Sequence, residues 1–96
     1  MKDIPYGCQC IDDADIAAVV EALRAEWLTT GPKVAEFEEV FAGYVGAKYA
    51  IAVSNGTAAL HAAMHAIDIG PGDEVIVPPM TFAATANCVV YQGGTP

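Results

Sequence analysis

The chain has few basic residues and many acidic ones. Among its 96 residues, 4 lysines and arginines stand against 12 aspartates and glutamates, which gives a formal net charge of −8 at pH 7. Proteins that bind nucleic acid or an anionic membrane surface neutralise phosphate groups with clustered basic side chains. The shortage of such residues argues against both kinds of partner, and any anionic ligand has to be attracted by local features such as helix N-termini.

Long apolar runs and a cysteine framework are also missing. Hydrophobic residues make up 54% of the chain, but they are spread over short segments, none of which approaches the length of a membrane span. The first residues lack the basic, apolar, small-residue order of a signal peptide. The cysteines Cys8, Cys10 and Cys88 are odd in number and have no zinc spacing. We therefore expect a cytoplasmic protein with neither disulfides nor a metal site.

What the chain does have is a polar turn between two apolar segments. A β-branched run over 49–53 is followed by Ser54-Asn55-Gly56-Thr57 and then by an alanine-rich helical run over 58–67. A strand, a small turn and a helix aim free backbone N–H groups at one point, where the positive end of the helix dipole also lies. This geometry favours a phosphate group, with Thr57 as a hydroxyl donor and Gly56 leaving the backbone accessible. In a simpler interpretation, the turn only caps the helix.

A second unit of the same kind follows. A Gly-Pro-Gly-Asp turn at 70–73 precedes a buried-strand candidate at 74–77, and a loop over 78–82 leads into another helix. Two successive strand–loop–helix units indicate a parallel sheet with ligand chemistry at the carboxyl ends of its strands. Thr57 and Phe82 lie at such ends, so a phosphorylated planar ligand suits the pair, with the Phe82 ring stacked on it. Alternatively, Phe82 is an ordinary core aromatic in the first turn of its helix.

The first half predicts two amphipathic helices whose role is packing. Asp12, with Asp15 three residues later, is the expected N-cap of the first helix. Pro32 suits the first position of the second helix, and Gly46 suits its end. The expected apolar stripes are Ile16, Val19, Val20, Leu23 and Trp27 on the first helix and Val34, Phe37, Phe41 and Tyr44 on the second.

Two further segments have open interpretations. The linker from Glu26 to Pro32 places two threonines and a glycine beside a tryptophan, which suits sugar hydroxyls and a stacked face, or simply ends one helix and caps the next. His61 and His65 share one face of the apolar helix over 58–67, and we expect them to be hydrogen-bonded packing residues, with that helix buried against the sheet.

Several motifs in order resemble one family. The sequence resembles the N-terminal quarter of the DegT/DnrJ/EryC1/StrS sugar-nucleotide aminotransferases, which are fold-type I pyridoxal-phosphate enzymes. The matching segments are Trp27-Leu28-Thr29-Thr30-Gly31-Pro32, Ser54-Asn55-Gly56-Thr57-Ala58-Ala59-Leu60-His61, Gly72-Asp73-Glu74-Val75-Ile76-Val77-Pro78 and Thr81-Phe82-Ala83-Ala84-Thr85-Ala86-Asn87. The segments at 4–7 and 86–96 are most similar to the UDP-4-amino-4,6-dideoxy-N-acetyl-β-L-altrosamine transaminases of pseudaminic acid biosynthesis.

The resemblance implies an α/β fold, a mostly parallel sheet in a three-layer αβα arrangement. Residues 1–47 would form an N-terminal helical segment with two helices, and residues 48–96 would begin the PLP-binding large domain as β-α-β-α. It also implies the binding residues. Gly56, Thr57 and Ala58 would hold the phosphate of pyridoxal 5'-phosphate, and Phe82 would stack on its pyridine ring. Substrate contacts are carried over to Tyr6, Glu26, Trp27, Leu28 and Thr29, with Gly56 also bordering the substrate.

The implied reaction moves an amino group from glutamate to C4 of a UDP-linked 4-keto-6-deoxy sugar in a homodimeric enzyme. The family's catalytic lysine would lie beyond Pro96, so the chain is expected to be an N-terminal fragment without catalytic residues of its own. Three alternatives stay open. A sister enzyme would use another nucleotide sugar, a variant with histidine in place of the lysine would perform dehydration, and a stand-alone phosphate-binding or interaction module would catalyse nothing.

Overall fold

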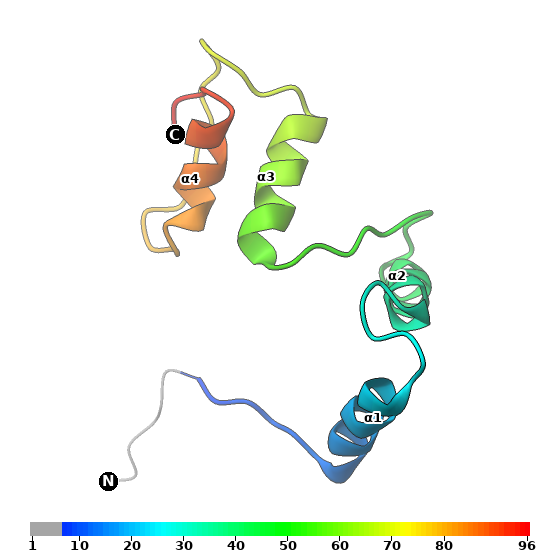
Figure 1. Ribbon diagram of the computed structural model, residues 1–96. Coiled ribbons are helices and arrows are strands. Elements are labelled where there is room, and N and C mark those ends of the chain that lie inside the picture. The colour runs from blue at the N-terminus through cyan, green and yellow to red at the C-terminus, as the bar shows by residue number, and fades with distance from the viewer. Residues whose placement is uncertain (1–6) are drawn as a thin grey trace, which may run out of the picture. The chain divides into compact units, whose positions relative to one another are not determined.

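The computed structural model describes residues 7–96, over which the chain forms four helices (Figure 1). They are α1 (Asp13–Arg24), α2 (Pro32–Val45), α3 (Gly56–Ala66) and α4 (Ala84–Tyr91). The chain divides into two compact units, Met1–Ala50 and Ile51–Pro96, which are described separately. No helix over residues 7–96 has the length and apolar character that crossing a bilayer requires.

In the first unit, the start of α1 and both ends of α2 form where the sequence predicts them. The Asp12 carboxylate accepts hydrogen bonds from the N–H groups of Ala14 at 2.9 Å and Asp15 at 3.0 Å. The Asp15 carboxylate in turn accepts from the Asp12 N–H at 3.0 Å, which completes a capping box. Pro32 is the first residue of α2, and Gly46 ends it in the left-handed conformation with φ of 71°. These three predictions are confirmed.

The predicted packing of the first unit is not formed over the described residues. α1 ends at Arg24, so Trp27 lies beyond the helix, and the expected apolar stripe is shorter than the sequence pattern. The rings of Phe37 and Phe41 stack with centroids 5.7 Å apart, but both side chains remain about half exposed. Ala42 is the only buried residue of the described part of this unit. The apolar faces of α1 and α2 are therefore open.

The second unit has a small core between its two helices. α3 and α4 pack side by side (Figure 1), and the buried residues Ala84, Cys88 and Val89 all belong to α4. The rings of His61 and Tyr91 meet edge to face, with centroids 5.2 Å apart. α3 itself has no buried residue. The expectation that this helix is buried against a sheet is therefore wrong for the described residues, because no sheet covers its outer face.

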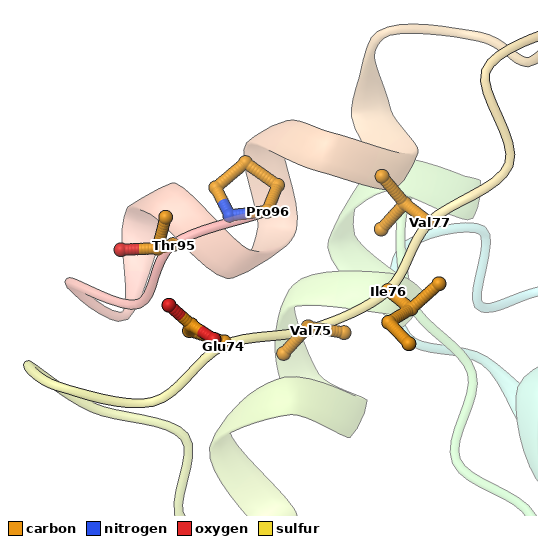
Figure 2. Close-up of a pocket in the computed structure, with 6 residues that line it drawn as sticks. All are labelled: Glu74, Val75, Ile76, Val77, Thr95 and Pro96. Atoms are coloured by element: carbon orange, nitrogen blue, oxygen red, sulfur yellow. The ribbon is translucent and has the colours of Figure 1, made fainter.

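The predicted strands at 49–53 and 74–77 do not form a sheet over residues 7–96. The only strand-like pairing described is a parallel bridge between Glu74 and Thr95 (Figure 2). The Val75 N–H donates to the Thr95 carbonyl at 2.9 Å, and the Thr95 N–H donates to the Asp73 carbonyl at 2.9 Å. The bridge is parallel, but a sheet needs several neighbouring strands to be stable, and the described chain provides too few. The predicted alternation of strands and helices is thus not confirmed over residues 7–96.

Candidate functional site

The start of α3 combines a side-chain cap with unused backbone donors. Asn55 has extended backbone angles and precedes the helix as its N-cap. Its Oδ1 accepts from the Ala58 N–H at 2.9 Å, and its Nδ2 donates to the Ser54 Oγ at 3.0 Å. Among the hydrogen bonds of residues 7–96, the N–H groups of Gly56 and Thr57 have no acceptor. A helix start leaves such N–H groups unpaired, and they point toward the positive end of the helix dipole.

This arrangement fits both interpretations of the turn at once. The Ala58 N–H serves the cap, while the N–H groups of Gly56 and Thr57 remain available to an anion. Gly56 is exposed, and a Cβ built on it meets no atom within 4 Å, so the approach to the backbone is open. Thr57 is half-buried and adds its hydroxyl. The role of Ala58 as a phosphate donor stays a prediction. A phosphate that bonds to the Ala58 N–H would have to displace the Asn55 amide oxygen.

The loop before α4 presents Phe82 to solvent. The side chain is 79% exposed, so the interpretation of Phe82 as a core aromatic is wrong in this structure. Its carbonyl accepts from the Thr85 N–H at 3.0 Å, and the hydroxyl oxygens of Thr81 and Thr85 lie 2.8 Å apart. An exposed ring on a hydrogen-bonded loop is suited to stacking on a planar ligand.

The two loops belong to one unit and to one end of its helix pair. α3 and α4 are in contact, and Figure 1 shows both helices beginning at the same end of the pair. The free donors of Gly56 and Thr57 stand at the start of α3, and Phe82 stands two residues before the start of α4. The sequence predicted a phosphate seat and an aromatic ring for two different loops, and the packing of α3 against α4 puts both loops at this end.

The linker between α1 and α2 contains a second candidate. Trp27 and Leu28 line a cavity of about 310 Å³ together with Gly31, Pro32 and Lys33. The carbonyl oxygen of Trp27 lies so close to Gly31 that a Cβ there would overlap it, which explains the glycine. Glu26 and Thr29 do not line this cavity. Tyr6, the remaining predicted substrate residue, lies outside the described residues.

Lys33 supplies a positive charge at this cavity. Its Nζ lies 2.9 Å from the Glu36 carboxylate, one turn along α2. This hydrogen bond, together with the attraction of the Glu36 charge, raises the pKa of Lys33 above its ordinary value of 10.5. Lys33 is therefore a cation at neutral pH, able to attract an anionic ligand but not to act as a base.

The structure also shows features that sequence reasoning missed. The Thr81–Thr85 hydroxyl contact joins two threonines four positions apart, and that spacing was the available signal. A further groove is lined by the extended segment at 74–77 and by residues 95–96, and no predicted site residue lines it (Figure 2). Its lining residues are Glu74, Val75, Ile76, Val77, Thr95 and Pro96.

Comparison with known proteins gives consistent matches. The model of the DegT/DnrJ/EryC1/StrS aminotransferase family matches residues 9–96. The spore coat polysaccharide biosynthesis protein SpsC of Bacillus subtilis is 50% identical over 93 residues, which are 97% of this chain and 24% of SpsC. The UDP-4-amino-4-deoxy-L-arabinose–oxoglutarate aminotransferase of Shewanella sediminis is 44% identical over 93 residues, again 97% of this chain and 24% of that protein.

A solved structure agrees with these sequence matches. Spr1654 from Streptococcus pneumoniae, in its PLP-form, superposes with a TM-score of 0.86 and 39% identity, over 99% of this chain and 24% of its own. The same protein has also been solved in a PMP-form. The chain spans about a quarter of the length of the curated relatives it matches.

Proposed function

The chain belongs to the DegT/DnrJ/EryC1/StrS aminotransferase family, and from this we propose that it is the N-terminal part of a pyridoxal-phosphate-dependent aminotransferase acting on a nucleotide-linked sugar. The observation that carries the proposal is the pair of free backbone donors at Gly56 and Thr57, at the same end of α3 and α4 as the exposed ring of Phe82. The relatives support it, since SpsC is named for polysaccharide biosynthesis and the Shewanella protein for an aminotransferase reaction.

The residues present fit the cofactor pyridoxal 5'-phosphate. The N–H groups of Gly56 and Thr57 and the Thr57 hydroxyl would hold its phosphate, with Ala58 joining if Asn55 releases its N–H. Phe82 would cover the pyridine ring, orient it and exclude water from one of its faces. When bound, the cofactor supplies an electron sink and carries the amino group from one substrate to the other. The PLP and PMP forms of Spr1654 support this assignment.

The proton-transferring lysine of the reaction is proposed to lie beyond Pro96. Within the described residues, Lys33 is paired with Glu36, and the Lys48 ammonium lies 5.0 Å from the centroid of the Tyr49 ring. Neither belongs to the loops that would hold the cofactor. The role of the described residues is thus to bind and orient, while the chemistry of proton transfer would belong to residues further along the polypeptide.

We assign the substrate as a UDP-linked 4-keto-6-deoxy sugar and the amino donor as glutamate. The Shewanella relative is named for a UDP-amino sugar and for oxoglutarate, the product that glutamate leaves after giving up its amino group. Tyr6, Glu26, Trp27, Leu28, Thr29 and Gly56 would form this chain's part of the sugar-nucleotide site. In that assignment the Trp27 ring and the Lys33 ammonium suit a base and an anionic diphosphate. We further propose a cytoplasmic homodimer that serves pseudaminic acid biosynthesis, with a sister enzyme for another nucleotide 4-keto sugar as the second candidate.

The cofactor assignment is tested in the full-length protein by the double change Thr57→Ala, Phe82→Ala. Loss of a phosphate donor and of the stacked ring should weaken retention of the cofactor, measured as the visible absorbance of bound aldehyde after gel filtration. Tyr44→Ala is the control, because it removes a ring that is 88% exposed in the other unit. Unchanged absorbance in the double variant would show that the cofactor is held elsewhere.

The substrate assignment is tested by product analysis. The purified enzyme is mixed with glutamate and, in separate reactions, with UDP-linked and dTDP-linked 4-keto-6-deoxy sugars, and 2-oxoglutarate and amino sugar are quantified by mass spectrometry. Faster turnover of the dTDP sugar would favour the sister-enzyme alternative. No amino sugar from either nucleotide sugar, despite intact folding, would favour a non-catalytic phosphate-binding module.

A further inference from the structure

One residue, Thr85, ties the loop of Phe82 to the buried part of α4. Its N–H donates to the Phe82 carbonyl at 3.0 Å, and its hydroxyl oxygen lies 2.8 Å from that of Thr81, so one hydroxyl donates to the other. Its own carbonyl accepts from the Cys88 thiol at 3.1 Å. Cys88 is only 2% exposed, so the chain of contacts ends in the core. Thr85 therefore bonds to the side chain of Thr81 and to the backbone of Phe82.

The Phe82 ring itself is largely exposed, and the hydrogen bonds of this residue act on its backbone. The side chain is 79% exposed and makes no ring–ring contact with another aromatic of residues 7–96. Ala83, the residue before α4, has no polar side chain with which to cap the helix. The direction of the ring consequently depends on the backbone of residues 81–83. The N–H groups of Ala86 and Asn87 bond to the Ala83 carbonyl, whereas Thr85 bonds both to the Phe82 carbonyl and to the Thr81 hydroxyl.

We propose that Thr81 and Thr85 form a hydroxyl clasp that pre-organises Phe82 for stacking on the cofactor. This inference rests on the proposed function. Thr85 is a positioning residue in this scheme, since it acts through Phe82 and touches neither cofactor nor substrate. A ring held in its binding orientation before the ligand arrives loses less conformational freedom on binding, so the clasp raises affinity without adding a contact.

The test uses the full-length enzyme with four variants: Thr85→Val, Thr81→Val, the double variant, and Thr85→Ser. Valine keeps the branched shape and removes the hydroxyl, whereas serine keeps the hydroxyl. Cofactor is removed with an amino donor and dialysis, pyridoxal 5'-phosphate is titrated back, and both the dissociation constant and the induced circular dichroism of the bound cofactor are measured. Thr95→Val is the control, because Thr95 is an exposed threonine of the same unit outside the clasp.

Each valine variant should weaken cofactor binding by about 3- to 10-fold, the range expected for one hydrogen bond. The induced circular dichroism should fall as well, since the ring no longer has one orientation. The double variant should be no worse than either single variant, because both remove the same bond. Thr85→Ser should restore affinity and spectrum, and Thr95→Val should leave both unchanged.

The outcomes separate this inference from the proposed function. If the unmodified enzyme binds no pyridoxal phosphate, both fail. If it binds the cofactor and Thr85→Val and Thr81→Val bind it with unchanged affinity and spectrum, the clasp is refuted and the proposed function stands. Additive effects in the double variant would also refute the clasp. Should Thr85→Val fail to fold, Thr81→Val decides, because Thr81 is exposed and lies outside α4.

Discussion

Replacing Gly94 with alanine probes how tightly the segment after α4 packs against its unit. A Cβ at this position would lie 2.9 Å from the Ile69 Cγ2 and 3.0 Å from the Val89 Cγ1, closer than a carbon normally approaches. Val89 is 1% exposed, so its side chain is enclosed by neighbouring atoms. Forcing an extra carbon into such a site costs about 1–3 kcal/mol. The Glu74–Thr95 bridge is next along the chain and should be strained by the same displacement.

Hydrogen exchange in the full-length protein measures this cost locally. A loss of about 1–3 kcal/mol raises the local opening equilibrium about 5- to 150-fold, so amides over 84–95 should exchange faster in Gly94→Ala by a factor in that range. The Gly94 amide itself reports on the site, since it donates to the Val89 carbonyl at 3.1 Å.

Gly43→Ala is the matched control. Gly43 lies inside α2, and a Cβ there meets nothing within 4 Å. Alanine is favoured over glycine in a helix by about 1 kcal/mol, so this variant should slow exchange in α2 and leave residues 84–95 unchanged. Exchange over 84–95 that is equal or slower in Gly94→Ala would refute the packing described for this segment.

Three further changes have defined outcomes. Thr30 has a left-handed φ of 52°, which is costly for a β-branched residue, so Thr30→Gly should relieve about 1 kcal/mol and raise the thermal midpoint; a lower midpoint would contradict the strain. Asp12→Ala removes the acceptor of the capping box and should destabilise α1 by about 0.5–2 kcal/mol, seen as faster exchange over Asp13–Arg24. Glu36→Gln removes the carboxylate that raises the pKa of Lys33, so that pKa should fall when followed by NMR. Because a raised lysine pKa stabilises the fold only while the amine is charged, any stability difference from Glu36→Gln should persist at neutral pH and disappear as the pH rises past the Lys33 pKa, above 10.5.

The helix ends were predictable because their causes are local. The capping box needs only Asp12 and Asp15, and the ends of α2 need only the fixed φ of Pro32 and the left-handed tolerance of Gly46. The helix expected over 58–67 begins two residues earlier, at Gly56, because Asn55 provides the cap. Trp27 shows the limit of periodicity: the apolar spacing continues to it, but the helix ends at Arg24, and spacing alone contains no stop signal.

The strands were less predictable because a strand is completed by its neighbours. Ile51 is 83% exposed and Ile76 fully exposed, as expected of apolar segments whose faces are not covered by packed elements over residues 7–96. The bridge at Thr95 shows that the segment at 74–77 accepts a parallel neighbour, which the chain supplies after α4. Sequence pattern therefore predicts segments able to form strands, whereas a ladder also needs neighbouring strands, and the described residues provide one parallel bridge.

The candidate site divides in the same way between local and non-local causes. Gly56 and Thr57 were identifiable because a helix start always leaves N–H groups unpaired. Which of these groups is free depends on the side-chain conformation of Asn55, and that conformation assigns the Ala58 N–H to the cap. An anion at this turn would meet the free N–H groups of Gly56 and Thr57, and it would have to displace Asn55 to reach the third donor, the Ala58 N–H. Asn55→Ala would free the third donor but remove the cap, so it should strengthen phosphate binding only if α3 stays folded. A variant with intact α3 and unchanged cofactor affinity would exclude Ala58 from the phosphate site.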